Sequence, residues 1–203
     1  MLDTATLDVR GFSVVDAARC LLAGGAQILQ LRHKGHWPRS VFQDAECIRA
    51  LCREAHAQFV VNDRADMAML LDAGLHVGQE DLPPREARRL MGPGAMLGYS
   101  THNAEQLAAA AAEPVDYLAI GPIFPTGSKQ NPDAAVGLEA LARYRKLTGR
   151  PLVAIGGIRR DTARAVLDAG ADSTAVIGDM LPQPCTAESL RERISEWQQL
   201  TRK

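Results

Sequence analysis

FVVNDR (residues 59–64) is a short apolar run followed directly by an amide and a carboxylate, and LHVGQED (75–81) has the same form. This pattern is typical of a buried parallel strand that leaves the core at its carboxyl end. If the two strands are neighbours, Asp63 and Asp81 lie side by side and repel each other unless a cation lies between them. Hard oxygen ligands favour Mg²⁺. The pattern therefore predicts a magnesium site at one end of a parallel sheet.

Short β-like runs alternate with amphipathic helical stretches along the whole chain. The predicted strands are 28–31, 59–61, 75–77, 96–99, 117–120, 152–155 and 174–177, and the predicted helices are 13–24, 38–56, 65–72, two turns after Pro83-Pro84, 104–112, 138–147, 161–168 and 187–199. Strands that alternate with helices indicate a parallel sheet. The count of eight helices and seven strands predicts an α/β fold of the TIM (β/α)₈ barrel type, in one domain over residues 1–203.

The first strand of this barrel is truncated or missing. Asp3–Arg10 is polar and carries no apolar run, and Leu2-Asp3 resembles the last residues of a strand. Either the chain was begun at an internal methionine or the barrel is damaged, which would expose sheet edges between strands two and eight. The alternative fold is an open doubly wound sheet, which would concentrate binding at one switch point. Charged, polar or glycine residues that could bind a ligand follow nearly every predicted strand, which favours the barrel.

Composition limits the function classes. A net charge of −1 gives no global field that would attract nucleic acid or a membrane surface. The chain starts with Met1-Leu2-Asp3, which has no charged n-region and is followed by no long apolar segment. We therefore expect no signal peptide and no membrane span. The four cysteines (Cys20, Cys47, Cys52 and Cys185) form no CxxC pair, which is typical of a reduced, cytoplasmic protein.

QLRHK (residues 30–34) closes the first visible strand. Gln30, Arg32 and Lys34 alternate along an extended backbone and so point the same way. Two cations and an amide suit a phosphate or pyrophosphate, although a solvated strand end explains them equally well. The carboxylates Asp63 and Asp81 have their own alternative explanation, which is helix N-capping.

Four further strand ends carry polar or glycine residues. GYSTH (98–102) offers Ser100 as a donor to phosphate and His102 as an acid or base, although for His102 we favour a place at the start of the next helix. The long loop from Gly121 to Val136 suits a mobile anion-binding lid. Glycines at 156, 157 and 178 suit backbone contacts to a phosphate, with a tight turn as the alternative.

The chain resembles the family of thiamine-phosphate synthases and thiazole tautomerases. The matching stretches are QLRHK (30–34), VNDRADMA (61–68), HVGQEDLP (76–83), GYSTH (98–102), DYLAIGPIFPTGSK (116–129) and VAIGGI (153–158). Each is weak by itself, but six in order form a specific signal that extends from about residue 13 to the C-terminus.

The resemblance implies a transferase of thiamine biosynthesis. A hydroxymethylpyrimidine diphosphate loses pyrophosphate in a dissociative step that gives a pyrimidine carbocation, and the nitrogen of a thiazole phosphate then attacks the CH₂ carbon. The products are thiamine phosphate and pyrophosphate. The departing pyrophosphate carries concentrated negative charge, so the reaction needs preorganised cations and benefits from Mg²⁺.

The resemblance also implies a role for each matching residue. Asp63 and Asp81 would bind Mg²⁺, and Gln30 would contact the pyrimidine. The diphosphate would be held by Arg32, Lys34, Asn62, Ser100 and Lys129. Thr126 and Ser128 would line the thiazole side, and Gly157, Ile177 and Gly178 would offer backbone donors to the thiazole phosphate.

The paired carboxylates favour a synthase, because the tautomerases of the family generally lack them. Thr126-Gly127-Ser128-Lys129 stands where the family has TxTK, and Gly178 stands where it commonly has serine. Two other functions stay open: a metal-independent, tautomerase-like isomerase that uses His102, and a non-catalytic barrel that binds phosphate ligands. The expected partners are small-molecule substrates, and we expect no binding to nucleic acid or to a membrane. The formation of a homo-oligomer stays an open alternative.

Overall fold

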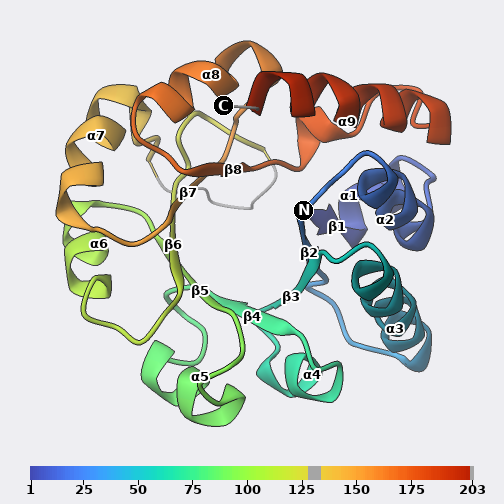
Figure 1. Cartoon of the computed structure of the whole chain (residues 1–203), viewed down its shortest axis with the longest axis horizontal. Helices are drawn as coiled ribbons and strands as arrows, with labels where there is room; N and C mark the ends of the chain where they lie inside the picture. Colours follow the sequence, from blue (N-terminus) through green and yellow to red (C-terminus); the bar gives the residue numbers. More distant parts are fainter. Residues whose placement is uncertain (128–133, 202–203) are drawn as a thin grey trace. The chain divides into compact units, whose positions relative to one another are not determined.

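The computed structural model describes residues 1–127 and 134–201, which fall into two compact units. Unit 1 is Met1–Leu75 with Ile177–Lys203, and unit 2 is His76–Val176. In both units a strand is followed by a helix (Figure 1). The expectation of one domain over residues 1–203 stays a prediction.

Unit 1 contains the two ends of the chain. Its elements are β1 (Leu2–Asp3), α1 (Thr4–Val9), α2 (Val14–Ala23), β2 (Ile28–Arg32), α3 (Arg39–Glu54), β3 (Gln58–Asn62), α4 (Ala65–Leu70), the first residues of β4 (Gly74–Val77), the 3₁₀ turn η2 (Gly178–Met180) and α9 (Ala187–Thr201). β1, β2 and β3 pair in parallel, with Leu2 opposite Leu31 and Leu29 opposite Phe59. All four of these side chains are buried.

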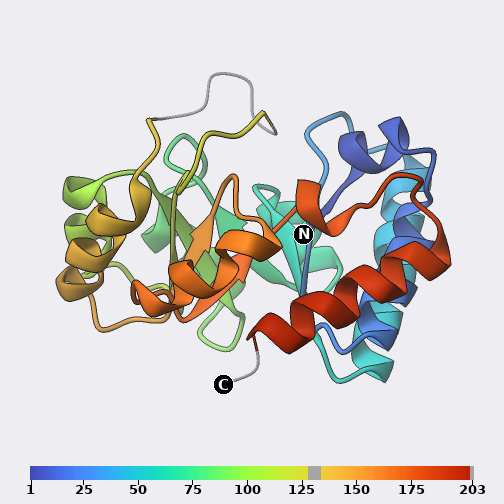
Figure 2. The same cartoon turned by 90° about the horizontal axis from the view of Figure 1, so that it is seen from above.

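The helices of unit 1 pack through a glycine contact. α2 lies against α3 and α9, as the second view shows for α9 (Figure 2). Gly24 ends α2, and a Cβ atom placed on it would lie 2.2 Å from Cγ2 of Ile194 on α9. The absence of a side chain at Gly24 therefore allows these two helices to pack closely.

Unit 2 holds the remaining elements. They are the end of β4, α5 (Pro84–Met91), β5 (Leu97–Thr101), α6 (Ala104–Ala110), β6 (Tyr117–Ile120), α7 (Gly137–Tyr144), the 3₁₀ turn η1 (Arg145–Leu147), β7 (Leu152–Ile155), α8 (Arg160–Asp168) and β8 (Ser173–Ala175). β5, β6, β7 and β8 pair in parallel in sequence order. Leu97 of β5, Leu118 and Ile120 of β6, and Leu152 and Ala154 of β7 are buried, so β5, β6 and β7 form the core of the unit.

Carboxylates close the amino ends of two strands in unit 2. Asp116 accepts a hydrogen bond from the backbone N–H of Leu97 at 2.6 Å, and Asp172 accepts one from the N–H of Leu152 at 2.8 Å. Arg88 pairs with Asp116 at 2.7 Å. These bonds satisfy the first backbone donors of β5 and β7.

The structure confirms most of the predicted elements to within two residues. The first strand has two residues, Leu2–Asp3, and it pairs with the edge of β2 at Leu31 and Arg32. α1 was not predicted, because its only buried residue is Leu7 and its start depends on a side-chain cap. β8 ends at Ala175 rather than Ile177, since Ile177 leaves the extended conformation (φ −115°, ψ −74°).

No helix in residues 1–127 and 134–201 is long and apolar enough to cross a bilayer.

We expect Gly24→Ala to lower the free energy of unfolding by about 1–3 kcal/mol, because the new methyl group overlaps Ile194. The backbone of Gly24 (φ −82°) accepts alanine without strain, so the loss would report the contact alone. Urea denaturation measures it. Gly94→Ala is the matched control, since no atom of the described residues lies within 4 Å of its added Cβ. Equal effects of the two changes would contradict the packing argument.

Candidate active site

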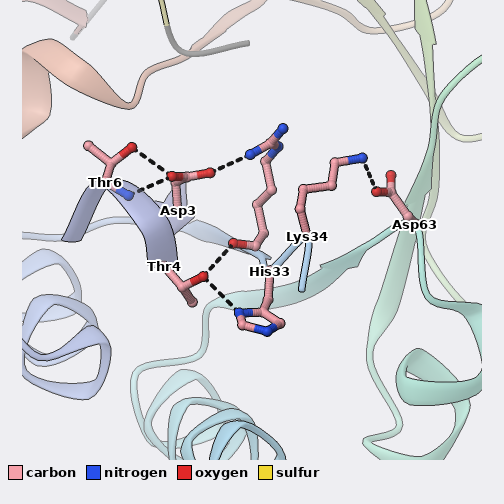
Figure 3. Close-up of polar contacts among 7 residues, drawn as sticks. Asp3, Thr4, Thr6, His33, Lys34 and Asp63 are labelled. Carbon is pink, nitrogen blue, oxygen red and sulfur yellow. Dashed lines mark hydrogen bonds and ion pairs between the residues drawn. The ribbon is translucent and has the colours of Figure 1, made fainter. Parts of the chain in front are cut away.

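Charged side chains gather at the carboxyl ends of β1, β2 and β3. Asp3 is the last residue of β1 and lies opposite Arg32, the last residue of β2. Lys34 follows β2 by two residues, and Asp63 follows β3 by one. The parallel register thus brings two cations and two carboxylates of unit 1 to one edge of its sheet (Figure 3).

Asp3 connects β1, α1 and β2. One carboxylate oxygen accepts hydrogen bonds from the N–H of Thr6 at 2.8 Å and its hydroxyl at 2.6 Å, which caps α1. The other accepts a bond from Nη1 of Arg32 at 2.6 Å. Asp3 is only 4% exposed. Burial alone would raise its pKa, but the bonds from Thr6 and Arg32 outweigh burial and lower the pKa below its usual value.

Lys34 forms an ion pair with Asp63 (Figure 3). The Lys34 side chain is 54% exposed and that of Asp63 is 18% exposed, so the lysine has more room to move. Asp63 has a left-handed backbone (φ +65°), and the N–H of Arg64 bonds to the carbonyl of Asn62 across it at 2.8 Å. A three-residue turn with positive φ is rare and strained, and it lies at the end of β3 directly below this carboxylate.

The segment that carries Lys34 is anchored on both sides. The hydroxyl of Thr4 lies 2.8 Å from Nδ1 of His33, and Nε2 of His33 lies 2.8 Å from the carbonyl oxygen of His36. Trp37 is buried and meets the His33 ring edge-on at 5.9 Å. The backbone around Lys34 is therefore held while its long side chain extends outward.

Two amide residues of unit 1 lie beside these charges. Gln30 is half-buried on β2, and its Oε1 is buried with no hydrogen-bond partner among the described residues. Asn62 ends β3 and is 7% exposed. A buried acceptor without a partner is costly unless a ligand satisfies it.

Ile177 and Gly178 lie at the start of η2, also in unit 1. α9 fixes this turn from behind: Arg193 donates to the carbonyl of Asp179, and Nε1 of Trp197 donates to its carboxylate at 3.1 Å. Ile177 and Gly178 therefore lie on a turn that contacts from α9 hold in place. Their contacts to a phosphate stay a prediction.

In unit 2, Asp81 closes a tight turn after β4. Its Oδ2 accepts a bond from the N–H of Gly78 at 2.7 Å. The N-cap residues of the helices that follow β3 and β4 are Arg64 and Pro83, and neither helix has a side-chain cap. Helix capping, the alternative explanation for Asp63 and Asp81, is therefore wrong.

A buried histidine that the sequence analysis did not assign contacts Ser100. His76 of β4 is 6% exposed; its Nε2 lies 2.8 Å from the hydroxyl oxygen of Ser100 and its Nδ1 lies 2.9 Å from that of Tyr117. Burial lowers the pKa of His76 to about 4, against a smaller opposing effect of Asp81. The sequence feature that could have indicated His76 is its position between two apolar residues of a buried strand.

His102 links the ends of two strands. Its Nδ1 lies 2.6 Å from the carbonyl oxygen of Gly121 at the end of β6, and its backbone N–H bonds to Gln106 of α6. Asn103, the next residue, caps α6 through a bond to the N–H of Gln106 at 2.9 Å. His102 therefore lies directly before Asn103, the N-cap of α6, and not within the helix.

Glycines after β7 have a packing role in unit 2. Gly157 has φ +65°, and a Cβ on it would lie 2.7 Å from the carbonyl oxygens of Phe124 and Pro125. Thr126 is half-buried at the start of the long loop. Ser128 and Lys129 lie outside the described residues. Close packing therefore explains why a glycine stands at position 157. Its contact to a phosphate stays a prediction.

The predicted site residues are divided between the two units. Unit 1 holds Gln30, Arg32, Lys34, Asn62, Asp63, Ile177 and Gly178, and unit 2 holds Asp81, Ser100, Thr126 and Gly157. Within the part of the chain that the structure describes, no three His, Cys, Asp or Glu side chains form a metal-binding group. A metal ion at either carboxylate would need oxygen ligands from a substrate or from water.

Parallel strands that alternate with helices and end in charged side chains define a TIM-type α/β barrel protein, the class in which active sites lie at the carboxyl ends of strands. The family model described as thiamine monophosphate synthase matches residues 4–180. The chain belongs to this family of enzymes, which act on small molecules.

Individual relatives agree with this membership. The thiamine-phosphate synthase of Koribacter versatilis is 51% identical over 185 residues, which are 90% of this chain and 84% of that protein. The synthase of Moorella thermoacetica is 42% identical over 182 residues, 89% and 87% of the two chains. The structure of the thiamine phosphate pyrophosphorylase from Pyrococcus furiosus matches with a TM-score of 0.81 and 35% identity, over 92% of this chain and 88% of that one.

We expect Asp3→Asn to lower the free energy of unfolding at pH 7 by about 1–3 kcal/mol, because Arg32 loses a buried charged partner. The pKa of Asp3 is lower in the folded chain than in the unfolded one. Its contribution is therefore complete above about pH 4 and is lost as the pH falls through the folded-state pKa.

Urea denaturation of both proteins between pH 7 and pH 3 tests this expectation. The difference between wild type and Asp3→Asn should shrink as the pH falls. Asp8→Asn, on an exposed position of the same helix, controls for removal of a carboxylate from α1. A difference for Asp3→Asn that is the same at every pH would contradict the argument.

Proposed function

We propose that this chain is a thiamine-phosphate synthase that joins hydroxymethylpyrimidine diphosphate to a thiazole phosphate and releases pyrophosphate. The observation that carries the proposal is the Lys34–Asp63 ion pair beside Arg32 at the carboxyl ends of β2 and β3. Cations beside a carboxylate suit a ligand that is a polyanion and arrives with a divalent cation.

The reaction needs no proton transfer in its central step. The bond between the pyrimidine CH₂ carbon and the diphosphate oxygen breaks, and its electron pair leaves with the diphosphate. The lone pair of the thiazole nitrogen then forms the new C–N bond. Charge grows on the departing diphosphate, so Arg32 and Lys34 would stabilise the transition state more than the bound substrate.

The remaining residues would bind and orient the two substrates. Gln30 has a buried acceptor with no partner among the residues that the structure describes, which suits the amino group of the pyrimidine. Asn62, Ser100 and Lys129 would donate to the diphosphate. We assign Thr126 and Ser128 to the thiazole side, and backbone donors at Gly157, Ile177 and Gly178 to the thiazole phosphate.

We also propose that Asp63 and Asp81 bind Mg²⁺. The donor set fits, because both are carboxylates that follow strands, and the active sites of (β/α)₈ proteins lie at those strand ends. When bound, Mg²⁺ supplies Lewis-acid stabilisation of the departing diphosphate. Lys34 would release Asp63 and turn to the phosphate oxygens, which its exposed side chain allows.

Purified protein with the pyrimidine diphosphate, the thiazole phosphate and Mg²⁺ should form thiamine phosphate and pyrophosphate in equal amounts. Chromatography of the reaction mixture measures both products. Failure to form thiamine phosphate in any divalent cation would overturn the proposed function. Metal-independent isomerisation of a thiazole, lost in His102→Ala, would instead identify a tautomerase-like enzyme.

We expect Asp63→Asn and Asp81→Asn to lower kcat/KM roughly 10²-fold or more, because each removes a charge that holds the cation. Asparagine is chosen at position 63 because it tolerates positive φ, so the change isolates the charge. Asp66→Asn removes a carboxylate that pairs with Arg64 at the surface and should stay close to wild type. Wild-type rates in Asp63→Asn or Asp81→Asn would remove that residue from the metal site.

Lys34→Met should have opposite effects on two ligands. Mg²⁺ alone should bind more tightly, because Lys34 no longer competes for Asp63, whereas pyrophosphate should bind more weakly, because a cation is lost. Calorimetric titration measures both affinities. Lys146→Met, at an exposed lysine of η1, is the control. A fall in both affinities would show that the Lys34–Asp63 pair does not compete with the metal ion.

A further inference from the structure

A chain of three polar side chains runs across β4, β5 and β6 in unit 2. Tyr117 of β6 contacts Nδ1 of His76, and Ser100 of β5 contacts Nε2 of the same ring. The rings of His76 and Tyr117 also stack, with centroids 5.5 Å apart and planes 26° apart. His76 is thus held by two bonds and one ring contact, which fixes the orientation of its imidazole.

The strand register shows that this chain runs along the strands. Tyr117 lies opposite Gly98, whereas Ser100 lies opposite Ala119, two residues nearer the carboxyl ends. Two residues of a strand span about 6.6 Å, and the imidazole of His76 bridges that distance. The half-buried Tyr117 is therefore connected through the buried His76 to a serine near the end of β5.

Gly98 makes the chain possible. A Cβ atom on Gly98 would lie 2.1 Å from Cζ of Tyr117 and 2.5 Å from Nδ1 of His76. Any side chain at this position would push the two rings apart. The glycine in GYSTH therefore provides the space in which the phenol and the imidazole meet.

The direction of the hydrogen bonds decides what Ser100 can do. A neutral imidazole has one N–H donor and one acceptor nitrogen, and burial keeps His76 neutral. If Nε2 accepted the Ser100 proton, that proton would point into the protein. If Nε2 carries the proton and donates to Ser100, the Ser100 hydroxyl can donate outward to an anion.

The phenol favours the second arrangement. With a pKa near 10, a tyrosine hydroxyl is a stronger proton donor than a serine hydroxyl, so Tyr117 is the better donor to Nδ1. A donor at Nδ1 leaves the ring proton on Nε2. Each group in the chain then donates to the next, and such chains of hydrogen bonds reinforce one another.

We propose that His76 is a positioning residue: Tyr117 fixes its tautomer, and the N–H at Nε2 holds Ser100 so that its hydroxyl donates to the diphosphate. This inference rests on the proposed function, because it takes Ser100 as a diphosphate donor. The ordinary alternative is a core histidine whose two nitrogens are merely satisfied.

Nitrogen-15 NMR of the unliganded protein tests the tautomer without any turnover. Wild type should have its ring proton on Nε2 of His76, and Tyr117→Phe should lower the population of this form. A wild-type proton on Nδ1, or a tautomer that Tyr117→Phe leaves unchanged, would overturn the proposal. Since no substrate is present, this result is independent of whether the proposed function is correct.

A double-mutant cycle tests whether His76 acts through Ser100. His76→Leu should lower kcat/KM roughly 10-fold to 100-fold, mostly in kcat, and less than Ser100→Ala does. In a Ser100→Ala background, His76→Leu should cost nothing further. Losses that multiply in the double mutant would overturn the proposal, since His76 would then act independently of the serine.

His76→Gln separates positioning from folding. Its amide can reach Ser100 with an N–H donor, so it should restore most of the rate lost in His76→Leu. Thermal unfolding identifies any variant that fails to fold, and pyrophosphate affinity replaces rate as the readout if wild type forms no thiamine phosphate. A folded His76→Gln that is as impaired as His76→Leu would overturn the proposal.

Discussion

A strand of two residues stays in a sheet only if side-chain bonds support it, and in unit 1 the carboxylate of Asp3 supplies them. β1 pairs with β2 over Leu2 and Asp3 alone. The same carboxylate caps α1 through Thr6 and holds Arg32 at the end of β2. The edge of this sheet, the first helix and one cation of the proposed site therefore depend on a single buried group.

The two cations of the proposed site in unit 1 are already paired in the structure. Arg32 bonds to Asp3, and Lys34 bonds to Asp63. These pairs differ in burial: Asp3 is buried on all sides and also serves α1, whereas Lys34 is mostly exposed. Exposed ion pairs are weak, so the Lys34–Asp63 pair can be exchanged for a ligand at little cost. The Asp3–Arg32 pair is the structural one.

The sequence predicted elements whose signal is periodic and local. β6 and β7 match at every residue, and the end of β3 was placed beside Asp63 from one apolar run. α1 was missed because a single buried leucine gives no period and its cap comes from a strand residue. His76 was missed because its partners, Ser100 and Tyr117, lie 24 and 41 residues away. Hydrogen bonds between strands this distant leave no local pattern.

Carboxylates serve two distinct purposes in this fold, and their surroundings separate them. At the amino ends of β5 and β7, Asp116 and Asp172 each accept a hydrogen bond from a backbone N–H and pair with an arginine. Protein groups therefore satisfy both carboxylates without a ligand. At the carboxyl end of β3, Asp63 has a strained left-handed backbone and pairs with an exposed lysine. Strain persists only where the surroundings maintain it, and capping α4 does not require it. The backbone of Asp63 therefore supports the proposed role of this carboxylate in binding a ligand.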